Sequence, residues 1–272
     1  MNPDTLPLRG IWRMARVGVH LASGAATVAL RYPRSDLARR LRLKQEWSRR
    51  LMGILGIESV FDGAMAQQPR LIVANHTSWV DIFAINAIAP AAFVCKDDVR
   101  GWPLIGWLCA NTDSIFIRRG DRRAARDVAK EVQLALLGGR TVAVFPEGTT
   151  TEGDTVLPFR GALLQPAIDS GYPLQPVALR YRGADGEPTS RVAYCGELSF
   201  IESLWRICST RGLTVELAAL PLLETTGAQR GALAHTCRAR ITSRLGLAEH
   251  HAPPTSSALT PTRDLAVSTV SA

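Results

Sequence analysis

The sequence predicts an α/β fold, in which a central, mostly parallel or mixed sheet is flanked by helices and preceded by a basic, amphipathic pair of helices. Two observations predict it. From residue 70 onward short apolar runs alternate with helix-like runs, and before residue 57 the chain is basic and helix-like. With 272 residues, 46% of them hydrophobic, the chain can bury one sizeable core or two small ones. We expect three parts: an N-terminal helical segment (1–56), an α/β domain (57–245) and a disordered tail (246–272).

The N-terminal segment carries the excess charge of the chain. Residues 1–50 contain 11 Lys and Arg against three acids, whereas the remainder is balanced at 21 and 21, so the formal charge of +8 belongs to this arm. A basic arm predicts an anionic partner, either a membrane or a nucleic acid. Residues 17–30 carry no formal charge but are fewer than the ~20 apolar residues that span a bilayer. They also lack the cleavage site of a signal peptide.

The second helix of the pair is basic and amphipathic. Apolar residues at helical spacing share one face: Leu37, Leu41, Trp47, Leu51 and Leu55. Basic residues fill the remainder: Arg39, Arg40, Arg42, Lys44, Arg49 and Arg50. This pattern is typical of an interfacial membrane anchor, and the alternative is a solvated helix that covers the core. A nucleic-acid binder is not favoured, since no zinc-finger spacing or aromatic RNA-binding strand is present.

The elements of the α/β domain follow in a regular order. Short apolar runs predict strands at 70–75, 91–96, 113–119, 141–147, 174–181 and 213–220. Helices are expected at 81–88, 102–110, 121–137, 161–169 and 227–245, with Asp121 as an N-cap and Gly138-Gly139 as a stop. Pro176 inside a strand indicates an edge position or a bulge. The five cysteines form no C-x-x-C pair, which favours reduced thiols in a cytosolic setting.

Polar residues end the first of these strands abruptly. The run at 71–74 stops at Asn75 and His76, and Asp81 follows five residues after the histidine. Ligands collect beyond the carboxyl ends of strands in α/β folds. An imidazole in the loop can accept a proton near neutral pH, and a carboxylate in the first helical turn can orient it. Thr77 and Ser78 are N-cap candidates between them, and a chance pairing remains the alternative.

Two more strand ends carry residues suited to a ligand. Glu147-Gly148-Thr149 follows the fourth strand, and a glycine there allows backbone N–H groups to approach a ligand, although an ordinary turn explains it equally. Arg118 and Arg119 end the third strand, where a guanidinium fork suits a phosphate. The alternative for this pair is a surface ion pair with Asp121 or Glu152.

Taken together, these motifs resemble the 1-acylglycerol-3-phosphate acyltransferase family of lysophospholipid acyltransferases. The resemblance covers residues 70–182 and rests on "NHTSWVD" (75–81), "IFIRR" (115–119), "FPEGT" (145–149) and "QPVAL" (175–179). The segments "KDDVRGWPLIG" (96–106) and "LPFRGAL" (157–163) are also similar to it. It implies a membrane-associated enzyme on the cytoplasmic face of the inner membrane, which moves an acyl group from acyl-CoA or acyl carrier protein to 1-acylglycerol-3-phosphate and makes phosphatidic acid.

The resemblance also implies roles for individual residues. His76 is the general base and Asp81 orients it, while Arg119 and the Glu147-Gly148-Thr149 turn hold the glycerol phosphate of the acceptor. Because like charges repel, Glu147 is expected to bind Arg119 or a glycerol hydroxyl rather than phosphate. Lys96 is a further cationic candidate. No cofactor is implied beyond the acyl donor, and no metal site is expected because His76 lacks a second histidine or cysteine at ligand spacing.

Two departures from the family pattern leave the acceptor open. Arg118 stands where an acid is common, and Thr150 stands where an arginine often follows "EGT". A different acceptor, such as lyso-ornithine lipid, is therefore the main alternative, and Arg160 or Arg118 could replace the missing cation. From another class, a non-catalytic lipid-binding module with the same fold is the remaining alternative.

Overall fold

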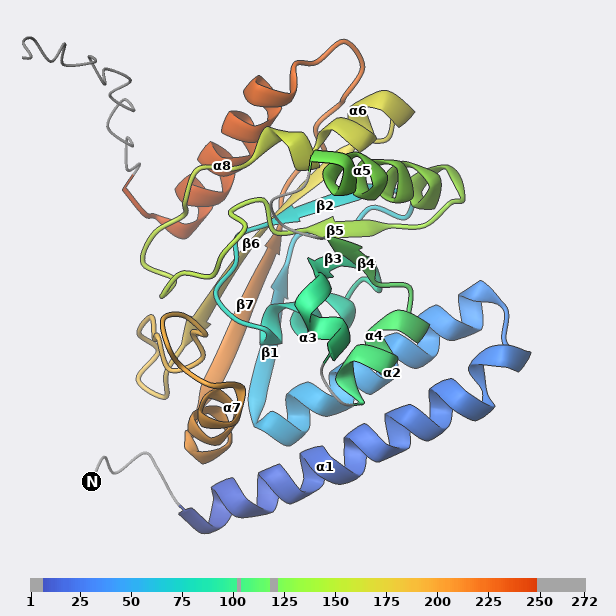
Figure 1. Cartoon of the computed structure of the whole chain (residues 1–272). Helices are drawn as coiled ribbons and strands as arrows, with labels where there is room; N and C mark the ends of the chain where they lie inside the picture. Colours follow the sequence, from blue (N-terminus) through green and yellow to red (C-terminus); the bar gives the residue numbers. More distant parts are fainter. Residues whose placement is uncertain (1–6, 102–103, 118–121, 249–272) are drawn as a thin grey trace, which may run out of the picture.

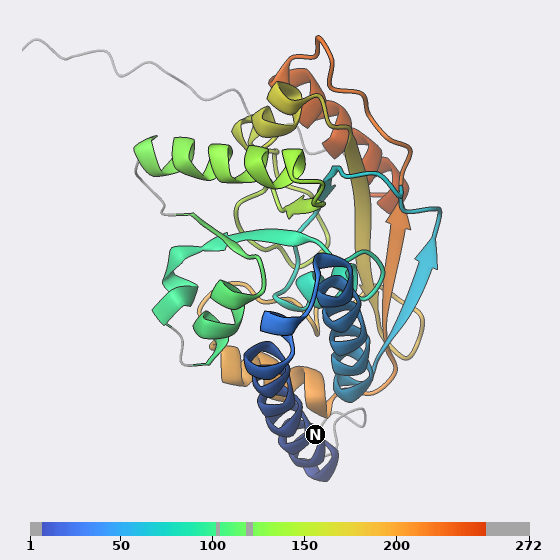
Figure 2. The same ribbon diagram turned by 90° about the vertical axis from the view of Figure 1, so that its right-hand side faces the viewer.

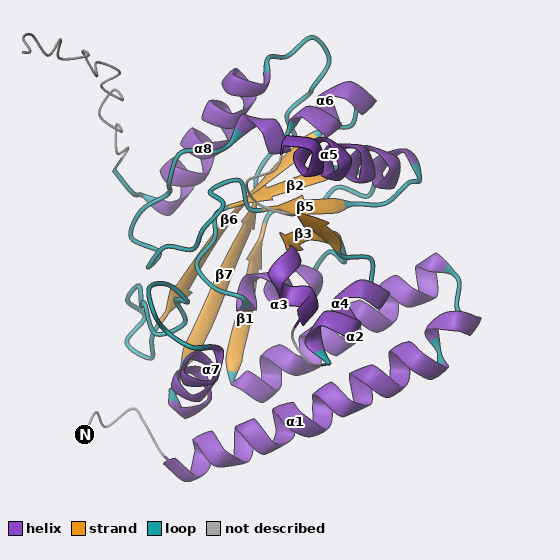
Figure 3. Ribbon diagram, viewed as in Figure 1, coloured by secondary structure: helices purple, strands orange, loops and turns teal. Residues whose placement is uncertain are grey.

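The computed structural model describes residues 7–101, 104–117 and 122–248 of the chain. In this part a seven-stranded sheet forms the centre, with the strand order β1-β7-β6-β2-β5-β3-β4 (Figures 1 and 3). The strands are β1 (Ile57–Asp62), β2 (Leu71–Ala74), β3 (Ala92–Lys96), β4 (Ile115–Ile117), β5 (Val142–Val144), β6 (Leu174–Arg182) and β7 (Leu213–Ala219). All pairs are parallel except β6 with β7, so the expected mixed, mostly parallel sheet is confirmed.

Helices lie on both faces of this sheet. They are α1 (Pro7–Leu30), α2 (Leu37–Leu55), α3 (Val80–Asn86), α4 (Ile105–Asn111), α5 (Arg122–Leu137), α6 (Gln165–Ser170), α7 (Phe200–Ser209) and α8 (Arg230–Leu245). Of these, α1 packs on the outside of α2 and α7. Short 3-10 turns occupy Tyr32–Arg34, Asp97–Gly101 and Gly161–Leu163. Every expected strand and helix has a counterpart here, whereas β1 and α7 were not expected. The expected cap Asp121 and most of the tail (249–272) lie outside the described residues.

Two apolar layers hold the helices on the sheet. On one face, buried residues of α2, α3 and α7 such as Leu55, Ile85 and Ile207 pack against β2, β6 and β7. On the other face, α5, α6 and α8 cover the opposite side of β2, β5 and β6 (Figure 2). The strands in the middle are buried on both faces, which is why they read as continuous apolar runs rather than as alternating ones.

Pro176 lies in an interior strand, so the expected edge position is wrong, and the bulge beside it has its extra residue on the partner segment rather than on β6. Leu174 pairs with Leu223 and Val177 pairs with Ala219, so residues 220–222 lie opposite only residues 175 and 176. The ladder with β7 begins only at Val177, while the Pro176 carbonyl accepts from Leu220 N at 2.9 Å. Proline has no N–H to return this hydrogen bond, and because Leu220 lies just beyond β7, the loss falls outside the regular ladder.

The amphipathic pattern led us to expect the basic side chains of α2 to face outward, but several of them turn inward. Lys44 Nζ donates to Thr112 O at 2.8 Å, and Arg49 Nε donates to Ala87 O at 2.6 Å. Burial lowers the pKa of Lys44 to about 8. Arg40 Nε likewise binds Tyr32 O at 3.0 Å. Cations near a helix end satisfy its unpaired carbonyls, so Arg49 caps the C-terminal end of α3 and Lys44 caps that of α4.

The outward face of α1 is apolar instead. Leu8, Trp12 and Val19 expose 83%, 65% and 73% of their surface. The helix contains no Asp or Glu. Its inner face packs on α7 and α2, with Trp47 and His20 stacked at 4.5 Å between their ring centroids. None of the described helices has a stretch apolar and long enough to cross a bilayer.

Candidate active site

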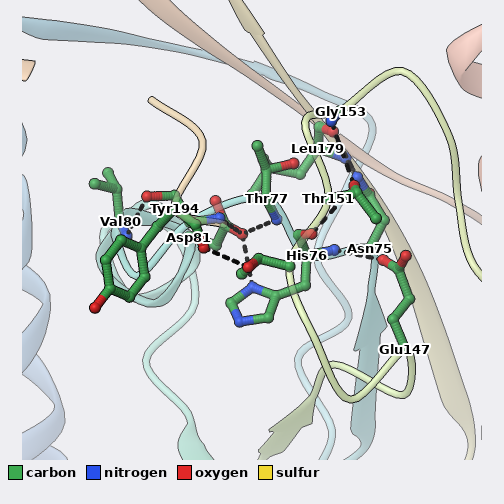
Figure 4. Close-up of polar contacts among 12 residues, drawn as sticks. Asn75, His76, Thr77, Val80, Asp81, Glu147, Thr151, Gly153, Leu179 and Tyr194 are labelled. Carbon is green, nitrogen blue, oxygen red and sulfur yellow. Dashed lines mark hydrogen bonds and ion pairs between the residues drawn. The ribbon is translucent and has the colours of Figure 1, made fainter. Parts of the chain in front are cut away.

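His76 lies at the carboxyl end of β2, in the loop that leads to α3, and its side chain is partly exposed. The imidazole Nδ1 is 2.9 Å from Asp81 Oδ2, so the two side chains meet as expected (Figure 4). A carboxylate only accepts hydrogen bonds, so Nδ1 donates, and in the neutral imidazole the lone pair is then on Nε2. Figure 4 shows Nε2 on the side of the ring away from Asp81.

Asp81 is fully buried, and every hydrogen bond it makes restrains the carboxylate. Its Oδ2 also accepts from the backbone N of Thr77 at 2.7 Å and of Ser78 at 2.9 Å. Its Oδ1 accepts from Tyr181 Oη at 2.7 Å. The expected N-cap at Thr77 or Ser78 is wrong: the N-cap is Trp79, without a side-chain bond, and the backbone N–H groups of Thr77 and Ser78 instead donate to the carboxylate of the first turn.

Tyr181 enters the site from β6 and remains a hydrogen-bond donor. Burial, together with the Asp81 carboxylate, raises the pKa of its hydroxyl well above the usual range. The hydroxyl therefore stays protonated and points its hydrogen at Asp81. Sequence reasoning missed this residue, although a tyrosine in a buried strand must find a polar partner and was a signal.

Asn75 ties the loop to β6. Its Nδ2 donates to Leu179 O at 2.9 Å, and its Oδ1 accepts from Leu179 N at 2.8 Å. The paired strands β2 and β6 end their register at Ala74 and Val177, so the Asn75 side chain continues the ladder where the backbone turns away. The chain can then direct His76 out of the sheet while its predecessor stays fixed.

Glu147 holds the backbone of His76. Its Oε1 accepts from His76 N at 2.7 Å, and its Oε2 accepts from Leu157 N at 2.8 Å. Burial raises the pKa of Glu147 to about 7, against the opposing effect of these two donors. Both oxygens thus have backbone partners, a role that the sequence did not reveal, and the expected contact with Arg119 involves a residue outside the described part of the chain.

The ring and the carbonyl of His76 have partners of their own. The imidazole stacks on Phe145 with ring centroids 4.0 Å apart and planes tilted by 10°. The His76 carbonyl accepts from Thr151 N at 3.0 Å. Backbone, ring and Nδ1 are therefore each fixed by a different neighbour, and no hydrogen bond engages Nε2 among the residues that the structure describes.

The turn after β5 meets one of the expected cations. Gly148 has a positive φ of 73°, and a Cβ built on it would lie 2.9 Å from Cζ of the Arg160 guanidinium. Thr149 is exposed on the same turn, and Thr150 Oγ1 donates to Tyr194 O. Arg118 and Arg119 lie outside the described residues, as does the side chain of Lys96, so their roles stay predictions.

The arrangement is suited to proton transfer. A histidine that donates through Nδ1 to a buried carboxylate presents Nε2 as a base, and the carboxylate stabilises the imidazolium that forms. Among the described residues, no three His, Cys, Asp or Glu side chains gather to bind a metal ion.

Comparisons with known proteins identify the family. A family model described as Acyltransferase matches residues 56–180. The lyso-ornithine lipid O-acyltransferase of Pseudomonas aeruginosa is 36% identical over 252 residues, which cover 90% of this chain and 96% of that protein. The chain belongs to this acyltransferase family. It is an enzyme of the lysolipid acyltransferase type, as the sequence motifs predicted.

Other acyltransferases agree with this assignment. The 1-acyl-sn-glycerol-3-phosphate acyltransferase of Neisseria gonorrhoeae is 40% identical over 147 residues, which cover 54% of this chain and 57% of that protein. The crystal structure of the 1-acyl-sn-glycerophosphate acyltransferase PlsC from Thermotoga maritima has the same fold. The TM-score is 0.68 with 21% identity, over 88% of this chain and 94% of that one.

Proposed function

We propose that this acyltransferase moves a fatty acyl group from acyl-CoA or acyl carrier protein to the free hydroxyl of a lysolipid, with His76 as general base. The observation that carries the proposal is the 2.9 Å contact between His76 Nδ1 and the buried Asp81 carboxylate. No cofactor beyond the acyl donor is needed for this reaction.

In this mechanism Nε2 of His76 takes the proton of the lysolipid hydroxyl as its oxygen attacks the thioester carbonyl carbon. The C–S bond then breaks, the new C–O ester bond remains, and the proton returns from the imidazolium to the departing thiolate. Asp81 keeps the ring oriented and balances its positive charge in between. The four hydrogen bonds to Asp81 hold that carboxylate in place throughout.

We favour lyso-ornithine lipid as the acceptor. The relative from Pseudomonas aeruginosa with that name matches along 96% of its length, whereas the 1-acyl-sn-glycerol-3-phosphate enzyme of Neisseria gonorrhoeae matches along 57% of its own. Thr150 supports the same acceptor. It is neutral where a phosphate-binding arginine is common, and its hydroxyl is engaged by Tyr194 O.

The second acceptor is 1-acylglycerol-3-phosphate, with phosphatidic acid as the product. The 40% identity to the Neisseria gonorrhoeae enzyme favours it. Either acceptor carries an anionic group, and the exposed Arg160 guanidinium beside Gly148 is placed to bind it near the turn after β5. Arg119, Arg118 and Lys96 are the further cations that we propose for this task, with Thr149 on the same turn.

We also propose that the protein works at the cytoplasmic face of the inner membrane, where its lipid acceptor is found. The apolar outer face of α1 supports an interfacial position, with Leu8 and Trp12 exposing 83% and 65% of their surface. A helix that lies in the interface keeps its apolar side among the acyl chains and needs no membrane-spanning length.

The test is an assay of the purified protein with labelled acyl-CoA or acyl carrier protein and a panel of lysolipids. We expect turnover of lyso-ornithine lipid in preference to 1-acylglycerol-3-phosphate, and a loss of several orders of magnitude for His76→Ala with an unchanged melting temperature. Preferential turnover of 1-acylglycerol-3-phosphate would make that lipid the favoured acceptor instead. Full cellular complementation by His76→Ala would favour the non-catalytic lipid-binding module.

A further inference from the structure

Helix α7 connects the candidate active site with the surface of the molecule. On its inner side, Ser203 Oγ accepts from Trp79 Nε1 at 3.1 Å, and the ring of Phe200 lies 5.1 Å from that of Trp79. Trp79 stands in the loop between His76 and Asp81. The position of α7 therefore bears directly on the loop that holds the reactive pair.

The outer side of α7 exposes two large apolar side chains next to the exposed Glu202 of its first turn. Ile201 and Trp205 expose 61% and 38% of their surface, and their spacing of four residues puts them on one side of the helix. Large apolar side chains are rarely left in water in a contiguous group without a partner. Tryptophan in particular is enriched where one side of a surface is apolar and the other is wet.

The same side of the molecule includes the N-terminal half of α1. A Cβ built on Gly10 would lie 2.9 Å from Trp205 Cζ3, so the two helices are in contact at this glycine. Both views show α7 beside this half of α1 (Figures 1 and 2). Leu8, Ile11 and Trp12 expose 83%, 59% and 65% of their surface there. We call the exposed apolar side chains of the two helices the α1–α7 surface: Leu8, Ile11, Trp12, Ile201 and Trp205.

Arginines border the α1–α7 surface. Burial lowers the pKa of Arg13, and the nearby positive charges of Arg9, Arg16 and Arg211 lower it further. Arg16 and Arg211 are exposed, and α1 has no acid of its own. Positive charge around an apolar surface complements an anionic bilayer, which attracts basic residues to its headgroups and apolar ones beneath them.

We propose that α7 is a second membrane-contacting element, which docks on an anionic bilayer together with α1 and so fixes the height of the His76 loop above the lipid. This inference rests on the proposed function, since it requires a lipid acceptor. It assigns bilayer contact to Ile201 and Trp205, which lie far in sequence from the basic N-terminal arm. The anchoring is thus shared between α1 and a helix of the α/β domain.

The experiment measures binding of the full chain to vesicles of neutral phosphatidylcholine, with and without phosphatidylglycerol, in the absence of substrate. Ile201→Glu is the test variant. It places an acid in the first turn of α7, where the helix dipole favours it, so we expect the variant to fold. Leu137→Glu on α5 is the control, because Leu137 is similarly exposed at 58% but belongs to a helix that covers the opposite face of the sheet (Figure 1).

We expect Ile201→Glu to bind anionic vesicles about tenfold more weakly or worse, since an apolar contact is lost and a repelling charge is added. Leu137→Glu should bind as the parent does. Equal binding of Ile201→Glu and the parent would overturn the proposal, as would a concentration-dependent dimer that Ile201→Glu abolishes, since a second copy would then be the occupant. His76→Ala should still bind vesicles, so that a failure of the proposed chemistry is distinguishable from a failure of docking.

Discussion

Replacement of Asp81 by asparagine isolates the charge of the reactive pair from its geometry. The asparagine oxygen can accept the three donors that now meet Oδ2, namely His76 Nδ1 and the backbone N of Thr77 and Ser78. Its NH2 group would then face Tyr181 Oη, which accepts once its own hydrogen rotates. We therefore expect Asp81→Asn to fold with the imidazole in place.

We expect Asp81→Asn to lower kcat rather than stability. Charges about 4 Å apart interact by about 4 kcal/mol at an effective dielectric constant of about 20. At 1.36 kcal/mol for each factor of ten, the loss of this interaction with the imidazolium lowers kcat by about 10³. The assay is steady-state turnover of labelled acyl-CoA and a saturating lysolipid, with thermal unfolding of the same preparation.

Asp81→Ala is the control for geometry. It leaves the four donors without their acceptor, at about 1–3 kcal/mol for each that stays unpaired, and we expect it to unfold or to melt far below the parent. If Asp81→Asn folds like the parent and its kcat falls less than threefold, the charge of Asp81 does not support the imidazolium, and the reasoning is refuted.

Three further predictions concern stability. Burial raises the pKa of Glu147 from 4.5 to about 7, so between these pH values the folded protein binds a proton that the unfolded chain does not. The stabilisation that comes from this proton is fully present below pH 4.5 and is lost as the pH rises through 7. Urea unfolding at pH 5 and pH 8 should show a decline of up to about 3 kcal/mol that is absent in Glu147→Gln; equal declines in both proteins would contradict this assignment. Asn75→Ala removes two buried hydrogen bonds to the Leu179 backbone and should cost roughly 2–4 kcal/mol in the same assay, whereas a loss under 0.5 kcal/mol would show that the bridge contributes nothing. Removal of residues 1–52 should yield an unstable protein rather than a soluble enzyme, and cooperative unfolding near the parental melting temperature would show the opposite.

The central strands and the reactive pair could be predicted from the sequence because both produce local patterns. Strands such as β2 and β5 are buried on both faces and appear as unbroken apolar runs. His76 and Asp81 are five residues apart and flank one loop, so a short-range argument suffices to bring them together. The family motifs then placed the turn at 147–149 beside them.

The missed elements lacked such patterns or were overlooked. β1 is exposed at all but its first residue and contains two acids, so it has neither an apolar run nor a clean alternation. The short helix α7 carries a Ser199 and Glu202 capping box, a local signal that would have located its start. Contacts over long separations leave no trace in either pattern, as between Tyr181 and Asp81 or between Glu147 and the His76 backbone.

The inward hydrogen bonds of α2 determine how a soluble form of this enzyme could be engineered. Arg49 donates to the carbonyl of Ala87 at the end of α3, and Lys44 donates to Ala91 O and to Thr112 O at the end of α4, so trimming the N-terminus would remove part of the scaffold behind the reactive loop. The donors that support the core lie on the inner side of α2, whereas the exposed apolar side chains lie on the outer side of α1. If α1 lies in the membrane interface as proposed, replacing Leu8, Trp12 and Val19 on its outer side by polar residues should release the protein from lipid and detergent while those carbonyls keep their donors.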